Sequence, residues 1–339
     1  MEIQQQVSLR HFNTFGLESE AEYFAEPQSV EELTDLLKDS RYMQIPKFIL
    51  SGGSNVLFTK NIDALVIHPD IKGIKKIKED EEFVWLDAGG GEVWQDLVNY
   101  CVNNNYAGIE NMSLIPGTVG AAPMQNIGAY GVEVKDVIET VSAVSISTAE
   151  PRIFSREECQ FGYRESVFKK ELKNQYIITG VVFKLKKSPD FNIEYGDIKR
   201  TLAEMKVENL SIKAISDAVI RIRQSKLPDP AVIGNAGSFF KNPEIDLLQY
   251  ELLKESYPEI PGYPVGPGKV KVPAGWLIEQ CGWKGKQIGN VASHKLQALV
   301  IINATGNATG KEIFDFSTMI IDSVKEKYGI ELEREVNII

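Results

Sequence analysis

The chain has 339 residues, of which 43% are hydrophobic and 25% are charged, and its formal net charge is -10 at pH 7. Two or three domains are expected, because a single hydrophobic core rarely serves more than about 250 to 300 residues. The acidic balance argues against a nucleic-acid groove, and any anionic ligand must be met by a local cluster of Lys and Arg.

Cysteine and histidine are scarce. Cys101, Cys159 and Cys281 are widely spaced and odd in number, which favours reduced thiols over a disulfide framework. With only three His and no zinc-type spacing, no metal site is expected. The polar N-terminus lacks the apolar core of a signal peptide, and apolar runs such as 296–302 are too short to span a bilayer. We therefore expect a cytoplasmic protein that does not enter the membrane.

The first predicted elements are a helix and a strand that leads into a glycine loop. A capping box begins at Ser29, and apolar residues at helical spacing predict an amphipathic helix over about residues 30–39. A strand over 47–50 then runs into the loop 51–55, Ser-Gly-Gly-Ser-Asn, and the apolar run 56–58 follows.

A second unit of the same kind follows. Residues 83–87 predict a strand that leads into Ala-Gly-Gly-Gly at 88–91, and Val93, Leu97 and Cys101 then recur at helical spacing. Glycine lets backbone N–H groups approach an anion closely, so both loops are candidates for binding a pyrophosphate. Judged by the glycines alone, tight turns at the ends of the two strands are an equally good interpretation. Neither loop is a Rossmann fingerprint, because the third glycine that close packing of helix and strand requires is missing.

The middle of the chain contains an unusual segment, residues 114–131, which is rich in Gly, Ala and Pro and almost uncharged. It is too irregular for a helix and too apolar for a linker, so we expect it to be buried. Runs 141–147 and 176–185 predict strands of a mixed sheet. The Pro-containing stretch 227–230 is the preferred domain boundary.

Beyond that boundary lies a Pro/Gly-rich span over 257–273. A helix is predicted over about 310–328, ending at Gly329, and a terminal strand over 331–338. The fold class is therefore α+β, with at least two domains.

Four segments resemble the FAD-binding signatures of the UDP-N-acetylenolpyruvoylglucosamine reductase family, in the family's order. They are Asn-Thr-Phe-Gly at 13–16, Gly-Gly-Ser-Asn-Val-Leu at 52–57, Ile-Pro-Gly-Thr-Val-Gly at 115–120 and Gln-Asn-Ile-Gly-Ala-Tyr-Gly at 125–131. The resemblance implies a p-cresol methylhydroxylase-type FAD-binding fold, in which two α/β subdomains hold FAD and a C-terminal α+β domain binds substrate. On this basis, residues 1–70 form the first subdomain, which the strand 331–339 could complete. Residues 71–220 form the second subdomain, and residues 221–330 form the substrate-binding domain.

The resemblance also implies the ligands and their contacts. The electron donor would be NADPH, and the substrate would be UDP-N-acetylglucosamine enolpyruvate. We expect the protein to be a monomer. The implied FAD contacts are Gly52, Gly53, Ser54, Asn55, Gly117, Thr118, Gly120, Asn126, Ile127, Gly128 and Gly131. The implied substrate contacts are Tyr130, Tyr195, Arg223, Lys226, Asn242, Lys284 and Gln297.

The implied catalytic residues are Arg164, Ser238 and Glu335. Reduction of an enol ether develops negative charge that a guanidinium could stabilise, and C2 needs a proton donor. By resemblance these are Arg164 and Ser238, with Glu335 beside Arg164 to help stabilise the enol intermediate. By pattern alone, Arg164 would be a surface ion-pair partner of Glu165 or Glu158, Ser238 a turn cap and Glu335 part of a solvated strand face.

One position departs from the family pattern, because Asn337 stands where Arg commonly follows Glu-Val. Two alternatives to the reductase also stay open. One is an oxidase of the same FAD fold, although no His follows either glycine loop as a covalent flavin link would require. The other is a nucleotide-sugar binding protein without catalysis.

Overall fold

The computed structural model describes residues 1–339 and contains seven α-helices and 20 strands. The contacts among these elements divide the chain into two units. Unit 1 consists of Met1–Val7, Ala21–Gly52 and Ile62–Ser225, and unit 2 consists of Ser8–Glu20, Gly53–Asn61 and Lys226–Ile339. Both units therefore contain short N-terminal segments, and the chain passes between them inside the first glycine loop, after Gly52.

The larger sheet of unit 1 has five strands in the order β11-β10-β12-β7-β6. Its strands are β6 (Ile74–Glu79), β7 (Phe83–Gly89), β10 (Ile138–Ser145), β11 (Pro151–Ser155) and β12 (Tyr176–Lys186). Every neighbouring pair is antiparallel, so the expectation of a mixed sheet around runs 141–147 and 176–185 is wrong. The reason is that β10 pairs with β12 and β11 rather than with a parallel neighbour, a non-local choice that local alternation does not encode.

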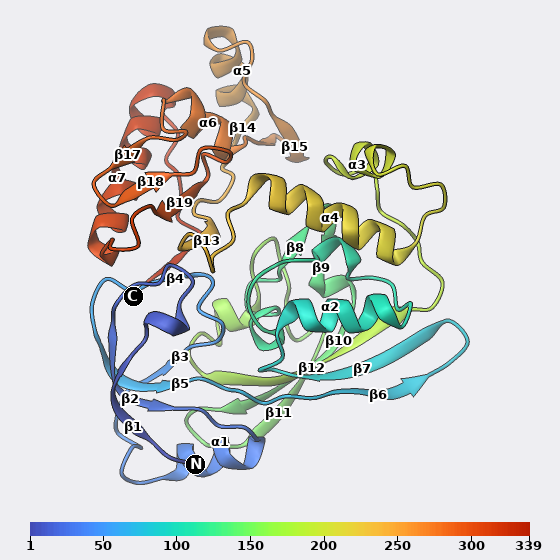
Figure 1. The fold of residues 1–339 in the computed structure, drawn as a ribbon, viewed down its shortest axis with the longest axis vertical. Coiled ribbons are helices and arrows are strands. Elements are labelled where there is room, and N and C mark those ends of the chain that lie inside the picture. Colours follow the sequence, from blue (N-terminus) through green and yellow to red (C-terminus); the bar gives the residue numbers. More distant parts are fainter. The chain divides into compact units, whose positions relative to one another are not determined.

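Helix α2 (Trp94–Asn103) runs along one face of this sheet (Figure 1). Its apolar stripe, which includes Leu97 and Val98, is fully buried with the inward residues of β7 and β12. The Trp94 ring meets Phe183 edge-on at 6.0 Å between centroids. The predicted helix is thus confirmed, and it anchors the chain directly after the second glycine loop.

A smaller sheet of unit 1 has the order β1-β2-β5-β3, with β2 and β3 both parallel to β5. Its strands are β1 (Gln4–Ser8), β2 (Glu20–Ala25), β3 (Lys47–Ile49) and β5 (Ile62–Ile67). Helix α1 (Val30–Lys38) packs against it through Leu33, Leu36 and Leu37. The Ser29 hydroxyl accepts the Glu32 amide, as the predicted capping box requires, but the Glu32 carboxylate accepts the Gln28 amide at 2.8 Å.

Unit 1 ends with two helices, α3 (Ile198–Glu204) and α4 (Ile212–Lys226). They share a small apolar cluster that includes Ile198, Ile215 and Ile222. The short pairs β8 (Gly128–Ala129) and β9 (Val132–Glu133) and three-residue helical turns make up the middle segment between α2 and β10. The division between the units falls after Ser225, at the end of α4.

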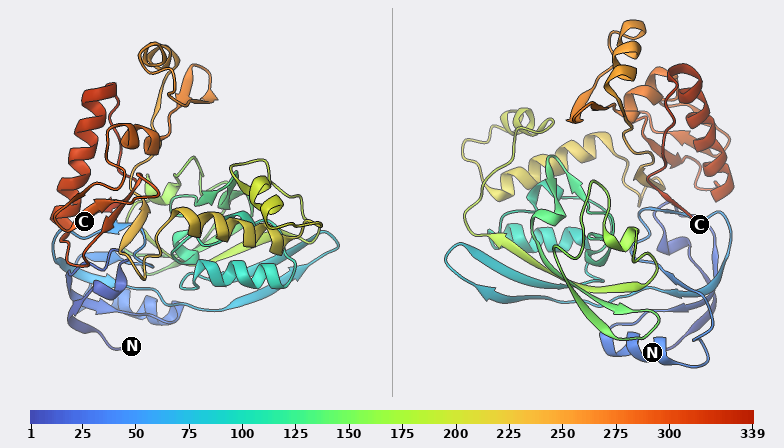
Figure 2. Two further views of the ribbon diagram at one scale, coloured as in Figure 1. Left: turned by 45° about the horizontal axis from the view of Figure 1, so that its top comes forward. Right: turned by 180° about the vertical axis from the view of Figure 1, so that it is seen from behind.

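The central sheet of unit 2 has the order β13-β19-β18-β17 and is antiparallel. Its strands are β13 (Asn235–Ser238), β17 (Gln287–Ile288), β18 (Val291–Ser293) and β19 (Val300–Asn303). The long helix α7 (Gly310–Tyr328) and the short α6 (Ala274–Gln280) complete the core, in which Leu277, Ile301 and Phe316 are buried. A small sheet of β14 (Glu244–Asp246), β16 (Lys269–Lys271) and β15 (Tyr263–Gly266) carries α5 (Leu247–Ser256), which has no buried residue and projects from unit 2 (Figure 2).

The C-terminal segment is less regular than predicted. Only β20 (Asn337–Ile338) forms a strand, parallel to β4 (Val56–Leu57), so the predicted strand over 331–338 is wrong in its extent. The physical reason is a change of partner. Upstream of Val336 the chain pairs with residues 239–241, through an isolated bridge at Arg334, whereas downstream it pairs with β4, and it bends between the two.

Helix α7 offers a test of local stabilisation, because Thr309 and Glu312 form a complete capping box at its start. We expect Thr309→Ala to lower the free energy of unfolding by about 1 kcal/mol at neutral pH. The Thr309 amide and hydroxyl lower the pKa of Glu312 below 4.5, so this contribution should be lost as the pH falls through that lowered pKa. Urea unfolding at several pH values measures it. Thr34→Ala, at a helical Thr whose hydroxyl only bonds back to the Val30 carbonyl, is the control and should change little.

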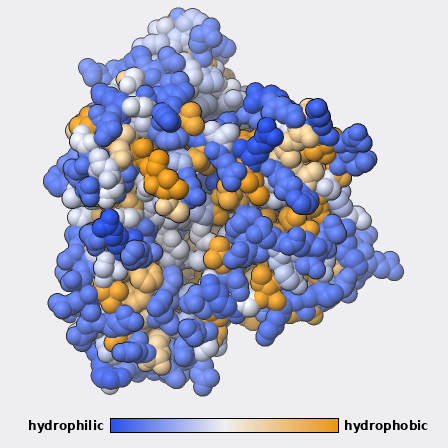
Figure 3. Space-filling view, viewed as in Figure 1, coloured by the Kyte–Doolittle hydropathy of each residue, from blue (hydrophilic) through white to orange (hydrophobic).

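None of the helices combines the length and apolar character needed to cross a bilayer. Polar and charged residues cover most of the face drawn in Figure 3, with apolar residues in small groups among them. The α+β class predicted from the sequence is confirmed by the separate antiparallel sheets and the helices that cover them.

Candidate functional site

The first glycine loop begins in unit 1, where it meets the segment 117–118. The Ser51 and Thr118 hydroxyls share a hydrogen bond, and a Cβ on Gly52 would lie 3.0 Å from the Cα of Gly117. Two backbones therefore approach each other at residues without side chains. Such a pair of loops can present main-chain groups to a phosphate without steric obstruction.

The loop at 89–91 packs tightly against neighbouring backbone, as a tight strand exit would. A Cβ on Gly89, Gly90 or Gly91 would lie 2.3, 2.8 and 2.6 Å from backbone atoms of Ile71 or Ile178. The carbonyl of Gly90 accepts the Gly120 amide at 2.8 Å. These glycines are thus explained by the close packing of strands, and they support the segment 117–120 from behind.

Segment 124–131 is built around Asn126, which is fully buried and has a φ of 46°. Its amide donates to the Gly162 carbonyl at 2.8 Å and its oxygen accepts the Lys135 amide at 3.1 Å. The side chain of Asn126 is therefore used to hold neighbouring loops in place. Ile127 and Gly128 follow it half-buried, and Gly131 is exposed.

Arg164 lies against this segment. Its guanidinium donates to the carbonyls of Asn126 and Gly128, at 3.3 and 2.6 Å. Its backbone has a φ of 57°, a left-handed conformation that is uncommon for a residue with a side chain and often found at functional sites. Glu165 forms an ion pair with Lys170, and Glu158 forms one with Arg152.

Arg223 and Tyr130 form a second polar group in unit 1. Burial lowers the pKa of Arg223 and raises that of Tyr130, and each side chain partly offsets the effect of burial on the other. The Nε atom of Arg223 is buried without a hydrogen-bond partner. A buried donor of this kind costs free energy unless a ligand satisfies it, so the pair is suited to an anionic or carbonyl group. Tyr195 lies close to Gly131 but its side chain is largely exposed, at 60%.

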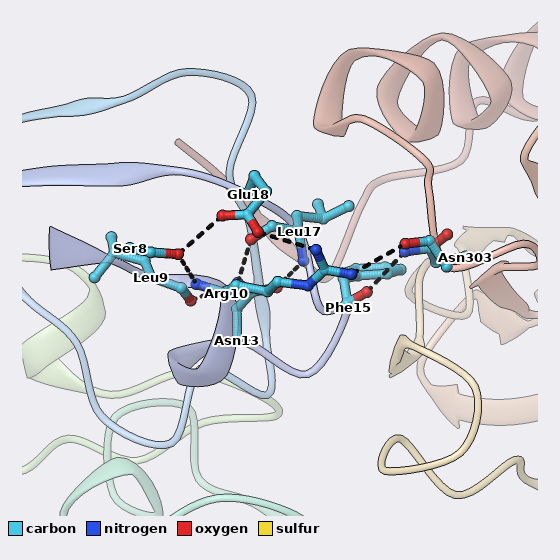
Figure 4. A network of polar contacts seen from close by, with 9 residues as sticks. Ser8, Leu9, Arg10, Asn13, Phe15, Leu17, Glu18 and Asn303 are labelled. Carbon is cyan, nitrogen blue, oxygen red and sulfur yellow. Dashed lines mark hydrogen bonds and ion pairs between the residues drawn. The ribbon is translucent and has the colours of Figure 1, made fainter.

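In unit 2, the Asn-Thr-Phe-Gly motif at 13–16 acts as a scaffold. The buried Asn13 amide donates to the carbonyls of Leu9 and Leu17, and its oxygen accepts the Leu17 amide. Figure 4 shows this turn, with Arg10 beside Glu18 and Asn303 directed at the Phe15 carbonyl.

The same turn holds two functional segments. The Thr14 amide donates to the Gly53 carbonyl, while the Thr14 carbonyl accepts the Asn235 amide. Gly53 has a φ of 57°, and a Cβ there would lie 1.9 Å from the Phe12 carbonyl oxygen. The motif thus fixes the second half of the glycine loop and the start of β13. Neither the turn residues nor their hydrogen bonds were identified as supports from the sequence, although the position of a buried Asn in a short turn is a usable signal.

Ser238 ends β13 at a bulge. The register of β13 on β19 shifts between Asn235 and Ser238, and Gly237 has a φ of 69°. The bulge leaves Ser238 exposed while Phe239 and Phe240 are fully buried in the core of unit 2. Phe239 and Phe240 thus anchor the end of the strand in the core.

Glu335 lies beside this strand. Its amide donates to the Phe239 carbonyl at 2.9 Å, and its own carbonyl accepts the Asn55 side chain at 3.2 Å. Unit 2 therefore brings together Ser238, Glu335 and the loop residues Gly53, Ser54 and Asn55. Glu335 is half-buried, unlike Glu331 and Glu333, which are exposed as a solvated strand face would predict.

The remaining predicted substrate contacts in unit 2 gather around α6. The Asn242 oxygen accepts the Ala274 amide at 2.9 Å, and a Cβ on Gly275 would lie 3.1 Å from the Gln297 oxygen. Lys284 pairs with Glu279 at 2.9 Å, near the end of the same helix. Lys226 is the last residue of α4.

The residues of the glycine segments fit an extended dinucleotide. In unit 1, a Cβ on Gly52 would lie 3.0 Å from the Cα of Gly117, and a Cβ on Gly120 would lie 3.0 Å from the Gly90 carbonyl oxygen. Gly53 provides the left-handed turn that carries the loop onward in unit 2. Main-chain donors at such loops suit a pyrophosphate, even in an acidic protein.

Two protein families match the chain. The family described as "UDP-N-acetylenolpyruvoylglucosamine reductase, C-terminal domain" matches residues 229–339, and the family "FAD binding domain" matches residues 21–154. The UDP-N-acetylenolpyruvoylglucosamine reductase of Flavobacterium johnsoniae is 52% identical over the full length of both chains. The protein of the same name from Pseudomonas putida is 44% identical over 99% of this chain and 98% of its own.

A crystal structure of UDP-N-acetylenolpyruvylglucosamine reductase from Thermus caldophilus superimposes with a TM-score of 0.70 at 24% identity, covering 100% of this chain and 99% of that one. This likeness in fold and the match to the FAD-binding domain confirm the p-cresol methylhydroxylase-type FAD-binding fold predicted above.

Proposed function

Because this chain belongs to the UDP-N-acetylenolpyruvoylglucosamine reductase family, we propose that it reduces its substrate through Arg164, Ser238 and Glu335. The chain is an FAD-dependent oxidoreductase that converts UDP-N-acetylglucosamine enolpyruvate to UDP-N-acetylmuramate, a precursor of peptidoglycan. We propose NADPH as the electron donor. Residues 1–70 and 71–220, with the C-terminal strand, would hold FAD, and residues 221–330 would bind the substrate.

FAD, when bound, supplies the hydride-transfer chemistry between NADPH and C3 of the enolpyruvyl group. The protein has to orient the substrate, stabilise the negative charge that develops toward its carboxylate, and protonate C2. Arg164 is suited to the second task, because a guanidinium stays charged at every working pH and its fork matches a carboxylate. The carbonyls of Asn126 and Gly128 fix the direction of this guanidinium without neutralising it.

Ser238 is the proposed proton donor to C2. A serine hydroxyl is a weak acid, so the assignment requires a neighbouring group that polarises it and replaces its proton. Glu335 is a candidate to influence Ser238, because its backbone is bonded to Phe239, the next residue in the chain. This contact is the observation that carries the proposal. In the proposed arrangement Glu335 also helps to stabilise the enol intermediate.

The diphosphate of the substrate needs local positive charge, since the whole chain carries a net charge of -10. We propose Arg223 and Lys226 for this role, with Tyr130 and Tyr195 closing over the same group. The buried, unpartnered Nε of Arg223 supports the assignment. Asn242, Gln297 and Lys284 would contact the remainder of the nucleotide sugar. We also propose that the protein acts as a monomer in the cytoplasm, where its three cysteines would remain reduced.

The proposal is tested by following flavin absorbance in the absence of oxygen. NADPH should bleach the oxidised flavin of the purified protein, and UDP-N-acetylglucosamine enolpyruvate should then restore it. A protein without a flavin spectrum would contradict the proposal. So would a reduced flavin that this substrate fails to reoxidise, as the binding-protein alternative predicts.

A further inference from the structure

The carbonyl of Asn55 is the meeting point of two segments of unit 2. It accepts the Asn337 main-chain amide at 3.1 Å and the Asn337 side-chain amide at 2.9 Å. In return, the Asn55 side chain donates to the Glu335 carbonyl at 3.2 Å. Three hydrogen bonds thus join one residue of the glycine loop to the two residues that flank Val336.

This junction lies where the C-terminal segment changes partner. The Glu335 amide bonds to Phe239, next to Ser238, whereas Asn337 and Ile339 continue along β4. Main-chain pairing joins β4 and β20 at two residue pairs, and Ile339 extends it by main-chain bonds to Leu57 and Thr59. The side chain of Asn337 adds the one donor that is specific to its residue type, since any residue there would keep the main-chain bond.

Arg334, the residue before Glu335, is bonded to helix α7. Its guanidinium donates to the hydroxyls of Ser317 and Thr318 on α7, at 2.8 and 2.6 Å, and lies 4.4 Å from the Phe314 ring centroid. Glu335 is therefore fixed to α7 on its N-terminal side. On its C-terminal side, the Asn55 contacts connect it to the glycine loop.

We propose that Asn337 is a positioning residue, which couples the loop that binds FAD to the segment that carries Glu335. It acts through the Asn55 carbonyl and needs no contact with FAD or substrate. Through that carbonyl, Asn337 fixes the position of the loop at Asn55 relative to Glu335 and to the neighbouring strand that carries Ser238. Both parts rest on the proposed function, in which the glycine loop contacts FAD and Glu335 acts on the substrate.

The test compares Asn337→Ala and Asn337→Asp with the wild-type protein. Alanine removes the side-chain donor, and aspartate keeps the shape but sets a carboxylate against the Asn55 carbonyl. We expect the FAD dissociation constant to rise about three- to tenfold for alanine and further for aspartate, because one net hydrogen bond is lost in the first case and replaced by repulsion in the second. Titration of the FAD-free proteins with FAD, followed by flavin fluorescence, measures these dissociation constants without any turnover.

The second measurement separates coupling from simple stabilisation. In both variants loaded with FAD, reoxidation of the reduced flavin by the enolpyruvyl substrate should slow more than its reduction by NADPH. Asn307→Ala is the matched control, because this exposed Asn of unit 2 bonds only within its own loop, to Thr305. It should change neither quantity.

Two results would overturn the proposal. One is an unchanged FAD affinity in both variants, and the other is a lower melting temperature with equal losses in the two half-reactions. A failure of the proposed function would appear differently, as wild-type reduced flavin that the substrate does not reoxidise.

Discussion

Replacing Ser238 by alanine is expected to slow reoxidation of the reduced flavin by UDP-N-acetylglucosamine enolpyruvate by about 10²- to 10⁴-fold, the usual contribution of a general acid. Reduction of the flavin by NADPH should stay close to the wild-type rate, because that half-reaction requires no proton at C2. Stopped-flow absorbance in the absence of oxygen measures the two half-reactions separately.

The structure makes this substitution a clean test. Ser238 is exposed at the end of β13, while Phe239 and Phe240 hold the strand in the core. Removing one exposed hydroxyl therefore costs little stability. Ser256→Ala, at the exposed end of α5, is the matched control and should leave both rates unchanged. Equal slowing of both half-reactions in Ser238→Ala would assign the residue a structural role and remove it from the mechanism.

A second comparison would test the chemistry rather than the position. Ser238→Cys keeps a transferable proton on a group of similar size, and a thiol is a stronger acid than an alcohol. Partial recovery of the second half-reaction relative to alanine would support proton donation at residue 238. A cysteine variant as slow as alanine would show that the hydroxyl is needed for something other than its proton.

Local signals in the sequence predicted helices α1, α2 and α7 but not α3, α4, α5 or α6. Ser29 marks the start of α1 and Gly329, whose φ is 64°, marks the end of α7, because each satisfies backbone groups of its own helix. Pairing between segments far apart in the sequence could not be predicted in this way. The change of partner at Val336 depends on where residues 239–241 and β4 lie, and no feature of residues 331–338 reports this.

In the candidate site, too, the sequence did not reveal contacts between residues far apart in the chain. Glycine composition identified both loops but could not separate Gly53, whose turn leads toward Asn55, from Gly89 to Gly91, which pack strands together. Ser238 and Glu335 were predicted from family resemblance, and only the folded chain shows the segment of Glu335 beside the end of β13. The hydroxyl pair of Ser51 and Thr118 was missed, because nothing in the sequence relates residues 67 positions apart.

Gly53→Ala is expected to have the largest effect on folding and on FAD retention. The φ of 57° at Gly53 costs a residue with a side chain about 1 to 2 kcal/mol, and insertion into a packed site costs about 1 to 3 kcal/mol more. The second cost arises because the new Cβ would lie 1.9 Å from the Phe12 carbonyl oxygen. Since the buried Asn13 fixes this turn from both sides, the oxygen cannot move away without breaking other hydrogen bonds.

Gly16→Ala separates the two costs, because Gly16 has a φ of 66° but no atom within 4 Å of its would-be Cβ. This substitution should lower the free energy of unfolding only by the cost of the left-handed backbone conformation, about 1 to 2 kcal/mol. Urea unfolding of the two FAD-free variants gives the difference, and flavin fluorescence should show weaker FAD binding in Gly53→Ala alone. If both variants lost the same stability and kept their FAD, the close contact with Phe12 would have no energetic weight, and the turn at 12–14 could not be what shapes the glycine loop. The conformation of the loop would then depend on Asn55 and its hydrogen bonds to the C-terminal segment. The Gly53 and Asn337 variants together therefore show whether the turn at 12–14 or the C-terminal segment holds the loop in place.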